Sequence, residues 1–201
     1  PPEAASDERN WTTPDDASVS AYEASKTLAE RAAWDFVAEH PTMALTSINP
    51  GAVFGPTMDG RYGSSLQVVE RVMSGKEPFA PPLSLPMVDV RDVATLHVAA
   101  IDLEAAKGER FAAAENTLSF LEAARILSAW DPNLKTAKRE APVWLLRLLS
   151  HVMPDVKAIV GGMGRNLSVS GAKAERVFGF EYIPTREALI ASAESIRRYQ
   201  S

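Results

Sequence analysis

The sequence contains no cysteine among its 201 residues, which excludes disulfide bonds, thiolate nucleophiles and cysteine-based zinc sites. No apolar run approaches the roughly 20 residues that a membrane-spanning helix needs, because the most apolar stretch, 143–153, contains Arg147 and His151. The three histidines, at positions 40, 97 and 151, have no metal-ligand spacing. The net charge of −5 disfavours non-specific binding to nucleic acid. We therefore expect a cytoplasmic protein that holds no metal and binds neither nucleic acid nor membranes.

A glycine-rich phosphate-binding turn is also absent. Such a turn lies between a strand and a helix, whereas the glycine cluster Gly161–Gly164 has the wrong spacing and follows a helical stretch. The chain does not begin with Met, and its first ten residues have the composition of a loop rather than of a signal peptide. We therefore expect a chain that starts partway through a larger fold.

Composition and periodicity predict a mixed α/β protein. Hydrophobic residues make up 46% of the chain and charged residues 23%, which is usual for a globular protein with a buried core. Helical periodicity alternates with short strand-like segments. Helices are expected over about 21–40, 66–74, 90–103, 119–130, 143–152, 171–178 and 185–199, and strands over 43–49, 87–90, 109–114 and 165–170. The proline-rich segment Pro78–Pro86 is expected to form neither a helix nor a central strand.

Three helix starts carry capping signals. Ser18 or Ser20 can cap the helix over 21–40, and Ser119 with a Glu three residues later forms a capping box. Asp89 and Asp92 suit a helix N-terminus because a carboxylate interacts favourably with the helix dipole there. We therefore assign these two carboxylates a structural role rather than a catalytic one.

One segment, SVSAYEASKTLAERAAWDF over 18–36, combines a helical pattern with a reactive pair. It places Tyr22 one turn before Lys26, and residues four apart are neighbours on a helix surface. A positive charge beside a phenol favours the phenolate, and a phenol tuned in this way can donate a proton to a carbonyl oxygen as hydride arrives at the carbon. An ordinary solvated helix surface carries such pairs as well, so the spacing alone leaves both interpretations open.

The expected strand over 43–49 is followed at once by NPGAVFGP, a loop rich in Gly and Pro. Ligands of open α/β sheets lie beyond the carboxyl ends of the strands. Backbone N–H and C=O groups of this loop could therefore meet a flat amide. A tight connection to the next helix is the alternative interpretation.

Together, YEASK, INPGAVFGP and PMVDVRDVA resemble the extended short-chain dehydrogenase/reductases of the NAD-dependent epimerase/dehydratase family. DERNWT before the tyrosine and KTLAERAAWDF around and after the lysine resemble the dihydroflavonol-reductase-like branch. Asn49-Pro50-Gly51 is similar to the reductase version of the loop, since nucleotide-sugar epimerases tend to carry an aromatic residue before their Asn-Val-x-Gly-Pro. The resemblance extends over essentially the whole chain, including SGAKAERVFGFEYIPT near its end.

The resemblance implies a fold. The chain would form the C-terminal half of an NAD(P)-binding Rossmann-type fold plus a small mixed α/β substrate lobe. Residues 1–56 would carry the catalytic helix, and residues 57–201 would be mainly the substrate lobe, with 86–115 returning to the Rossmann sheet. The first βαβ cofactor unit, and the family's Ser or Thr that binds the carbonyl, would precede Pro1. The chain would then require its own N-terminal half.

The resemblance also implies roles for residues. Tyr22 would be the general acid, and Lys26 would hold the ribose hydroxyls of the nicotinamide cofactor. The residues expected to line the nicotinamide are Pro50, Gly51, Ala52 and Val53. The candidates for substrate contact, which an ordinary polar loop would explain equally well, are Arg61, Tyr62 and Ser64.

The implied activity is reduction of a small carbonyl compound, an aldehyde, a ketone or a dihydroflavonol-like molecule. The cofactor would be NADP or NAD, with NADPH favoured, and the residues that choose between them would precede Pro1. A sugar-nucleotide epimerase or dehydratase and a hydroxysteroid-type dehydrogenase are alternatives in the same superfamily, and a non-catalytic binding module is an alternative of another class. A homodimer is a further expectation, because the tyrosine-bearing helix of this superfamily often packs against its equivalent in a second subunit.

Overall fold

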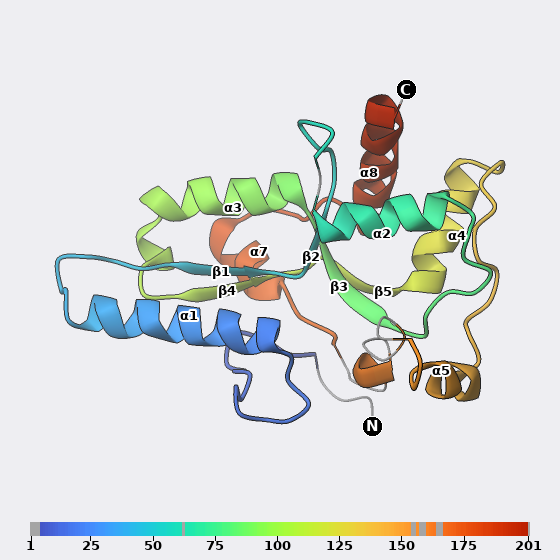
Figure 1. The fold of residues 1–201 in the computed structure, drawn as a ribbon. Coiled ribbons are helices and arrows are strands. Elements are labelled where there is room, and N and C mark those ends of the chain that lie inside the picture. Colours follow the sequence, from blue (N-terminus) through green and yellow to red (C-terminus); the bar gives the residue numbers. More distant parts are fainter. Residues whose placement is uncertain (1–4, 62, 154–155, 157–159, 164–166, 201) are drawn as a thin grey trace.

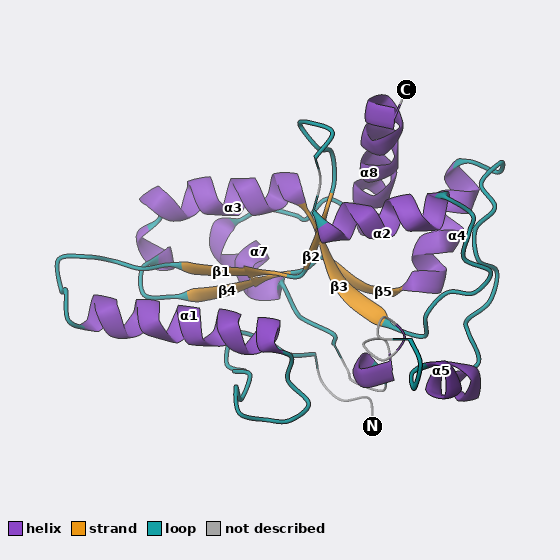
Figure 2. Ribbon diagram, in the orientation of Figure 1, coloured by secondary structure: helices purple, strands orange, loops and turns teal. Residues whose placement is uncertain are grey.

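The computed structural model describes residues 5–61, 63–153, 156, 160–163 and 167–200 (Figure 1). Helices and strands are interspersed up to residue 119, and the described elements after it are helices (Figure 2); this mixture confirms the predicted α/β class. The helices are α1 (Ala21–Ala38), α2 (Ser64–Met73), α3 (Val90–Asp102), α4 (Phe120–Trp130), α5 (Val143–Leu149), α7 (Ala172–Phe178) and α8 (Thr185–Gln200), with a 3₁₀ turn at Glu104–Ala106. The strands are β1 (Ser47–Pro50), β2 (Ala52–Phe54), β3 (Ser84–Asp89), β4 (Arg110–Ala113) and β5 (Asn116–Ser119).

The strands form two small sheets in which parallel pairing predominates. β1 pairs with β4 in parallel, with Ser47 opposite Arg110 and Pro50 opposite Ala113. β3 pairs in parallel with β2 and antiparallel with β5, so β3 is the middle strand of a three-stranded sheet. Parallel strands need a crossover connection, and helices α2 and α3 lie within the connections here.

The prediction for Pro78–Pro86 was wrong at its end, because Ser84, Leu85 and Pro86 belong to the central strand β3. Proline has no N–H to donate to a second neighbouring strand. β2 begins at Ala52, which pairs with Met87, so these first three residues of β3 pair with β5 alone among the described strands. The proline therefore lies where the missing donor is not required.

Two hydrophobic cores hold the sheets in place. One forms where α2, α4 and α8 meet β2 and β3, and it includes Phe54, Val69 and Leu127. The other forms where α3 and α7 meet β1 and β4, and it includes Leu96 and Phe111. Burying a side chain of this size contributes roughly 1.5–3 kcal/mol. The cores therefore fix the strand ends on which the candidate site is built.

Helix α1 is attached to the molecule differently. Ser20 and Glu23 form a capping box at its start, so the predicted start is confirmed. The helix lies against the β1–β4 pair on the side opposite α3 (Figure 1). Thr27 is its only buried residue, whereas Leu28 and Phe36 are 55% and 52% exposed. Apolar burial therefore contributes little to the placement of α1 among the described residues.

Both carboxylates with a predicted structural role have one. Asp89 is the N-cap of α3 and accepts a hydrogen bond from the Arg91 N–H at 2.8 Å, while its carboxylate pairs with the Arg91 guanidinium. Asp92 accepts a hydrogen bond from the Ile183 N–H at 2.9 Å, which ties α3 to the segment before α8. Burial raises the pKa of Asp92 above its ordinary value.

Two of the predicted strands differ from the structure. The strand expected over 43–49 begins only at Ser47. The strand expected over 165–170 is wrong within the described residues, where Val169 forms only an isolated bridge with Ser6; positions 165 and 166 lie outside the described residues. Among the described residues, no helix combines the length and the apolar character needed to cross a membrane.

Candidate functional site

The capping box places Tyr22 in the first turn of α1, where the residue is 70% exposed. Lys26 follows one turn later, and its Nζ lies 5.4 Å from the centroid of the Tyr22 ring. Both residues border one large cleft, so the structure brings the predicted pair together on one wall. In the part of the chain that is described, no carboxylate pairs with Lys26. Its ammonium is therefore available to a ligand in the cleft.

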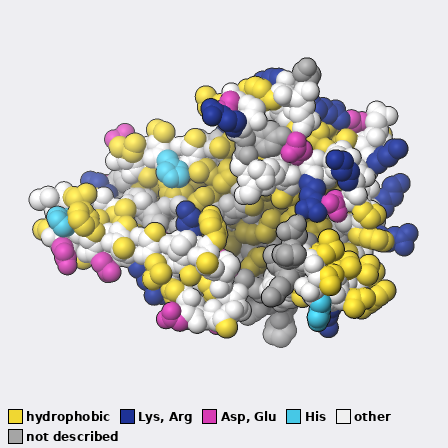
Figure 3. Space-filling model, in the orientation of Figure 1, with side chains coloured by type: hydrophobic (Ala, Val, Ile, Leu, Met, Phe, Trp, Pro, Cys, Tyr) yellow, Lys and Arg dark blue, Asp and Glu magenta, His cyan; other side chains and the backbone are white. Residues whose placement is uncertain are grey.

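The cleft has a volume of about 890 Å³ and lies between α1, the ends of β1 and β2, and the start of α2. Phe54, Val68 and Leu85 form an apolar wall, and Figure 3 shows hydrophobic side chains on the floor of the hollow between α1 and α2. The predicted residues that border it are Tyr22, Lys26, Pro50, Gly51, Ala52, Val53 and Ser64. The rest of the lining includes many polar and charged side chains, and a cleft of this size that combines apolar surface with converging polar groups suits a small-molecule ligand.

The turn between β1 and β2 depends on Gly51. Its N–H donates to the carbonyl oxygen of Ala113 at 2.9 Å. A Cβ atom at this position would lie 2.5 Å from the carbonyl oxygen of Pro86, so only glycine fits without displacement. The prediction of a loop was wrong for most of the segment 50–53, because Pro50 ends β1 and Ala52 and Val53 belong to β2, which pairs with β3. The close approach at Gly51 packs this segment, called the cofactor loop below, against β3 at the edge of the cleft.

The three predicted substrate residues have different outcomes. The Arg61 side chain is 95% exposed, pairs with Asp59 at 3.8 Å and does not border the cleft. Tyr62 lies outside the described residues. Ser64 is the first residue of α2 and does border the cleft, next to Ser65.

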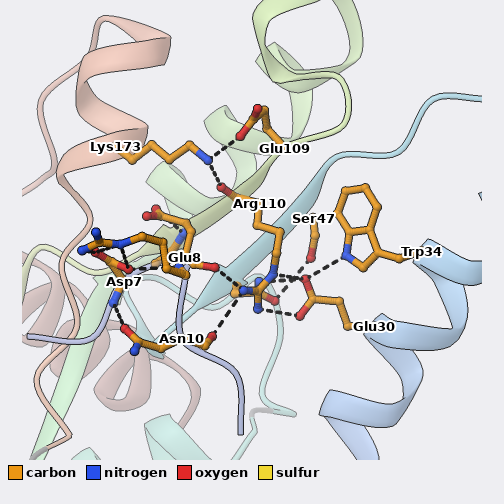
Figure 4. A network of polar contacts seen from close by, with 12 residues as sticks. Asp7, Glu8, Asn10, Glu30, Trp34, Ser47, Glu109, Arg110 and Lys173 are labelled. Carbon is orange, nitrogen blue, oxygen red and sulfur yellow. Dashed lines mark hydrogen bonds and ion pairs between the residues drawn. The ribbon is translucent and has the colours of Figure 1, made fainter.

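A polar network on the same cleft includes residues that the sequence patterns did not reveal (Figure 4). Glu30 lies one turn after Lys26 on α1. Its two carboxylate oxygens accept hydrogen bonds from Arg110 Nε at 2.8 Å and Nη2 at 3.0 Å. Glu30 Oε1 also accepts from Asn49 Nδ2 at 3.2 Å and from Trp34 Nε1 at 3.3 Å. One carboxylate thus contacts α1, β1 and β4.

Arg110 extends this network to the segment before α1. Its Nη1 donates to the backbone carbonyls of Glu8 and, at 3.3 Å, of Asn10. Its guanidinium carbon lies 3.7 Å from the centroid of the Trp11 ring, within the range of a cation–π contact. Asn10, Trp11 and Arg110 all border the cleft. The N-terminal segment is therefore tied to the same pair of strands as α1.

The network keeps the Glu30 carboxylate ionised. Burial alone would raise the pKa of Glu30, whose side chain is 14% exposed. Hydrogen bonds from Arg110, Ser47, Asn49 and Trp34 outweigh that effect and lower the pKa to about 2. Glu30 therefore acts as a fixed acceptor rather than as an acid or base near neutral pH.

One sequence signal could have identified part of this network. Tyr22, Lys26 and Glu30 recur at a spacing of four, which places them along one side of the helix. Arg110 follows Glu30 by 80 residues, and nothing local to Arg110 or Trp11 marks them as partners. Only the fold brings them together.

The three histidines have local backbone contacts. Nδ1 of His40, His97 and His151 lies 2.7 to 2.9 Å from the carbonyl oxygen four residues earlier in each case. Within the described ranges, no three His, Asp or Glu side chains gather as a metal-binding set.

A sequence model described as the NAD-dependent epimerase/dehydratase family matches residues 1–114 of the chain. Among curated proteins, cinnamoyl-CoA reductase CAD2 of Medicago truncatula is 31% identical over 176 residues, which cover 88% of this chain and 48% of that protein. NADPH-dependent methylglyoxal reductase GRE2 of Saccharomyces cerevisiae is 28% identical over 199 residues, covering 94% and 54% respectively. The chain spans about half the length of the curated relatives it matches.

Solved structures give the same picture of the fold. Gre2 from Candida albicans in its complex with NADPH matches with a TM-score of 0.68 and 26% identity, covering 90% of this chain and 52% of that one. Vestitone reductase from alfalfa (Medicago sativa L.) matches with a TM-score of 0.71 and 17% identity, covering 96% and 58%, a likeness that shows the fold alone. The matches confirm the predicted fold class, part of a Rossmann-type short-chain dehydrogenase fold.

Proposed function

Because the chain belongs to the NAD-dependent epimerase/dehydratase family, we propose that it carries the catalytic helix and part of the substrate wall of an NADPH-dependent carbonyl reductase. The resemblance inferred from YEASK, INPGAVFGP and PMVDVRDVA is confirmed at the level of the family. Several relatives are named as reductases, among them the NADPH-dependent methylglyoxal reductase GRE2. These names support the activity proposed here for the whole protein.

The observation that carries the proposal is the placement of Tyr22 and Lys26 on the wall of the cleft, beside the loop 50–53. Tyr22 donates a proton to the carbonyl oxygen of the substrate. Lys26 holds the ribose hydroxyls of the cofactor, and the Tyr22 phenol, one turn earlier on α1, lies beside it at the nicotinamide end of the cofactor. When bound, NADPH supplies the hydride that reduces the carbonyl carbon.

The residues at this end of the cleft fit a nicotinamide cofactor. The ammonium of Lys26 is a donor that no described carboxylate occupies. The loop 50–53 borders the cleft at the carboxyl end of β1, which is where ligands of open α/β sheets lie. The close contact of Gly51 with Pro86 keeps this loop flat against β3.

The opposite wall suits a small carbonyl substrate. Val68 and Leu85 supply apolar surface, while Ser64 and Ser65 at the start of α2 supply hydroxyl groups. Such a wall can hold an aldehyde or ketone with one or two polar substituents. We keep Ser64 as a substrate contact in the proposal and leave Arg61 out, since it does not border the cleft.

Other predictions stay open for the whole protein. The division of the chain near residue 56, the homodimer and the cytoplasmic location remain predictions. A sugar-nucleotide epimerase or dehydratase of the same family is distinguished by assaying sugar nucleotides alongside the aldehydes and ketones.

Replacement of Tyr22 by Phe in the whole protein tests the proposal. General acid catalysis contributes typically 10²–10⁴-fold, so Tyr22→Phe should lower kcat with a panel of aldehydes and ketones by at least about 100-fold. NADPH should still bind to the variant, which is measured by the change in NADPH fluorescence on binding. Tyr199→Phe is the matched control, because the Tyr199 hydroxyl donates to the Met58 carbonyl at 2.7 Å and lies outside the cleft lining.

Two results would contradict the proposal. Turnover that survives Tyr22→Phe would show that this phenol is not the proton donor. Conversion of a sugar nucleotide without net consumption of NADPH would assign the protein to the epimerase class instead.

A further inference from the structure

We propose that Glu30 and Arg110 form a positioning pair that holds the Tyr22–Lys26 end of α1 in register with the cofactor loop. The inference rests on the proposed function, since it concerns the alignment of the proposed catalytic groups. Neither residue is assigned a contact with the reacting atoms. They act by fixing where the helix lies.

Helix α1 is attached to the sheet with little apolar burial. A helix that packs on a sheet usually buries an apolar stripe. In α1 only Thr27 is buried, and the large apolar side chains Leu28 and Phe36 are exposed. Apolar burial against the described residues therefore contributes little to its position along the sheet. Directional polar contacts have to define that position.

Glu30 is the residue of α1 with those contacts. Its carboxylate accepts from Arg110 on β4 and from Asn49 on β1, as well as from Trp34 on α1 itself. Asn49 immediately precedes Pro50, the first residue of the cofactor loop. A single carboxylate thus connects the catalytic helix directly to the strand that carries the loop.

The helix can transmit this constraint to the site. Glu30 lies eight residues after Tyr22 and four after Lys26, on the same side of the helix. Eight residues correspond to about 12 Å along the helix axis. Over that length a helix is rigid, so a shift or rotation at Glu30 displaces the phenol and the ammonium by a similar amount.

The contacts of Arg110 in the positioning pair require a guanidinium group. Its side chain is 18% exposed, and it forms two parallel bonds to the carboxylate while Nη1 donates to the Glu8 and Asn10 carbonyls. The same guanidinium lies 3.7 Å from the Trp11 ring. A lysine ammonium cannot provide the planar fork and the stacking together. The segment before α1 and α1 itself are thus held by one side chain.

The test uses three variants of the whole protein, Arg110→Met, Arg110→Lys and Glu30→Gln. The matched control is Arg197→Met. Arg197 pairs with Asp131, and its guanidinium carbon lies 4.4 Å from the centroid of the Trp130 ring, but none of these three residues borders the cleft. The control therefore removes the same kinds of contact at a place unconnected with α1.

Two readouts are measured on each variant. Steady-state kinetics give kcat and the KM for NADPH, and hydrogen exchange followed by mass spectrometry reports on peptides covering 21–38, with 120–130 of α4 as internal reference. A misplacement of about 1 Å can cost about 100-fold in rate, so Arg110→Met and Glu30→Gln should lower kcat by between about 10-fold and 100-fold. Because Lys26 moves with the helix, the KM for NADPH should rise as well, and exchange in 21–38 should accelerate. Arg110→Lys should recover only part of kcat.

The outcomes separate this inference from the proposed function. Equal losses of kcat in Arg110→Met and Arg197→Met would overturn the positioning role, because both would then reflect general destabilisation. Full recovery of kcat in Arg110→Lys would overturn it as well, since charge alone would suffice. If the parent protein shows no NADPH-dependent turnover, the proposed function fails, and the exchange data alone decide the proposal that Glu30 and Arg110 hold α1 in place. Unchanged exchange over 21–38 in Arg110→Met and Glu30→Gln then refutes it, and accelerated exchange there supports it.

Discussion

The Glu30–Arg110 pair predicts an acid-dependent component of stability that Glu30→Gln removes. Burial opposes ionisation of this carboxyl, but the hydrogen bonds from Arg110, Ser47, Asn49 and Trp34 prevail and lower its pKa from 4.5 to about 2. A group whose pKa is lower in the folded state stabilises the protein at pH values above its unfolded pKa. That stabilisation is lost as the pH falls through the folded-state value.

The size of the effect follows from these two pKa values. A carboxyl that titrates at 4.5 when unfolded and at about 2 when folded contributes about 3 kcal/mol to the free energy of unfolding near neutral pH. Between pH 6 and pH 3.5 the contribution falls by about 1.4 kcal/mol, and by pH 2 less than about 0.5 kcal/mol remains. Glu30→Gln has no such titration at this position. The gap in stability between the parent protein and the variant should therefore narrow by about 1.4 kcal/mol over the first interval.

Urea unfolding of both proteins, followed by circular dichroism at pH 6 and pH 3.5 and constant ionic strength, measures this gap. Glu104→Gln is the matched control, because Glu104 is 85% exposed in its contact with Lys107, and exposed pairs contribute about 0–1 kcal/mol. A gap between the parent protein and Glu30→Gln that stays constant from pH 6 to pH 3.5 would refute the reasoning. It would mean that the carboxylate is not selectively stabilised by its partners.

Two further predictions concern the supports of the cofactor loop. Gly51→Ala should lower the free energy of unfolding by about 1–3 kcal/mol and weaken NADPH binding, because the added Cβ would meet the Pro86 carbonyl oxygen at 2.5 Å. Gly63→Ala is the control, since a Cβ at position 63 meets nothing within 4 Å. Equal effects of the two substitutions would contradict the argument. Ser192→Ala should cost about 1–3 kcal/mol, because the fully buried Ser192 hydroxyl accepts from the Gly55 N–H at 2.7 Å and the variant leaves that donor unpaired. The exposed Ser74→Ala is its control in thermal unfolding, and a loss no larger than that of Ser74→Ala would show that another group satisfies Gly55.

Local sequence signals predicted the helices well, because their causes are local. The capping residue Ser20 and the apolar periodicity that follows lie within one segment, and α1 begins at Ala21 as expected. Ser119 with Glu122 marks the start of α4 for the same reason. The strands were harder to predict, since a strand exists only where a partner lies beside it. Ser84–Pro86 became strand through pairing with β5, which proline content could not reveal.

The sequence by itself determined the family and the helix that carries Tyr22 and Lys26, and it singled out the segment 50–53, because a spacing of four on one helix and a run of Gly and Pro are properties of contiguous residues. It did not reveal that Ala52 and Val53 belong to strand β2, which exists through pairing with β3. Only the tertiary structure decided that the helix and the segment 50–53 border one cleft, that Arg61 lies outside it, and that Glu30 is held by Arg110 across 80 positions of the chain. The register of β1 against β4 places Ser47 opposite Arg110, and from this position on β4 the Arg110 guanidinium reaches Glu30 on helix α1. Contacts of this kind depend on strand pairing and packing between distant segments, and no local pattern of residues encodes them.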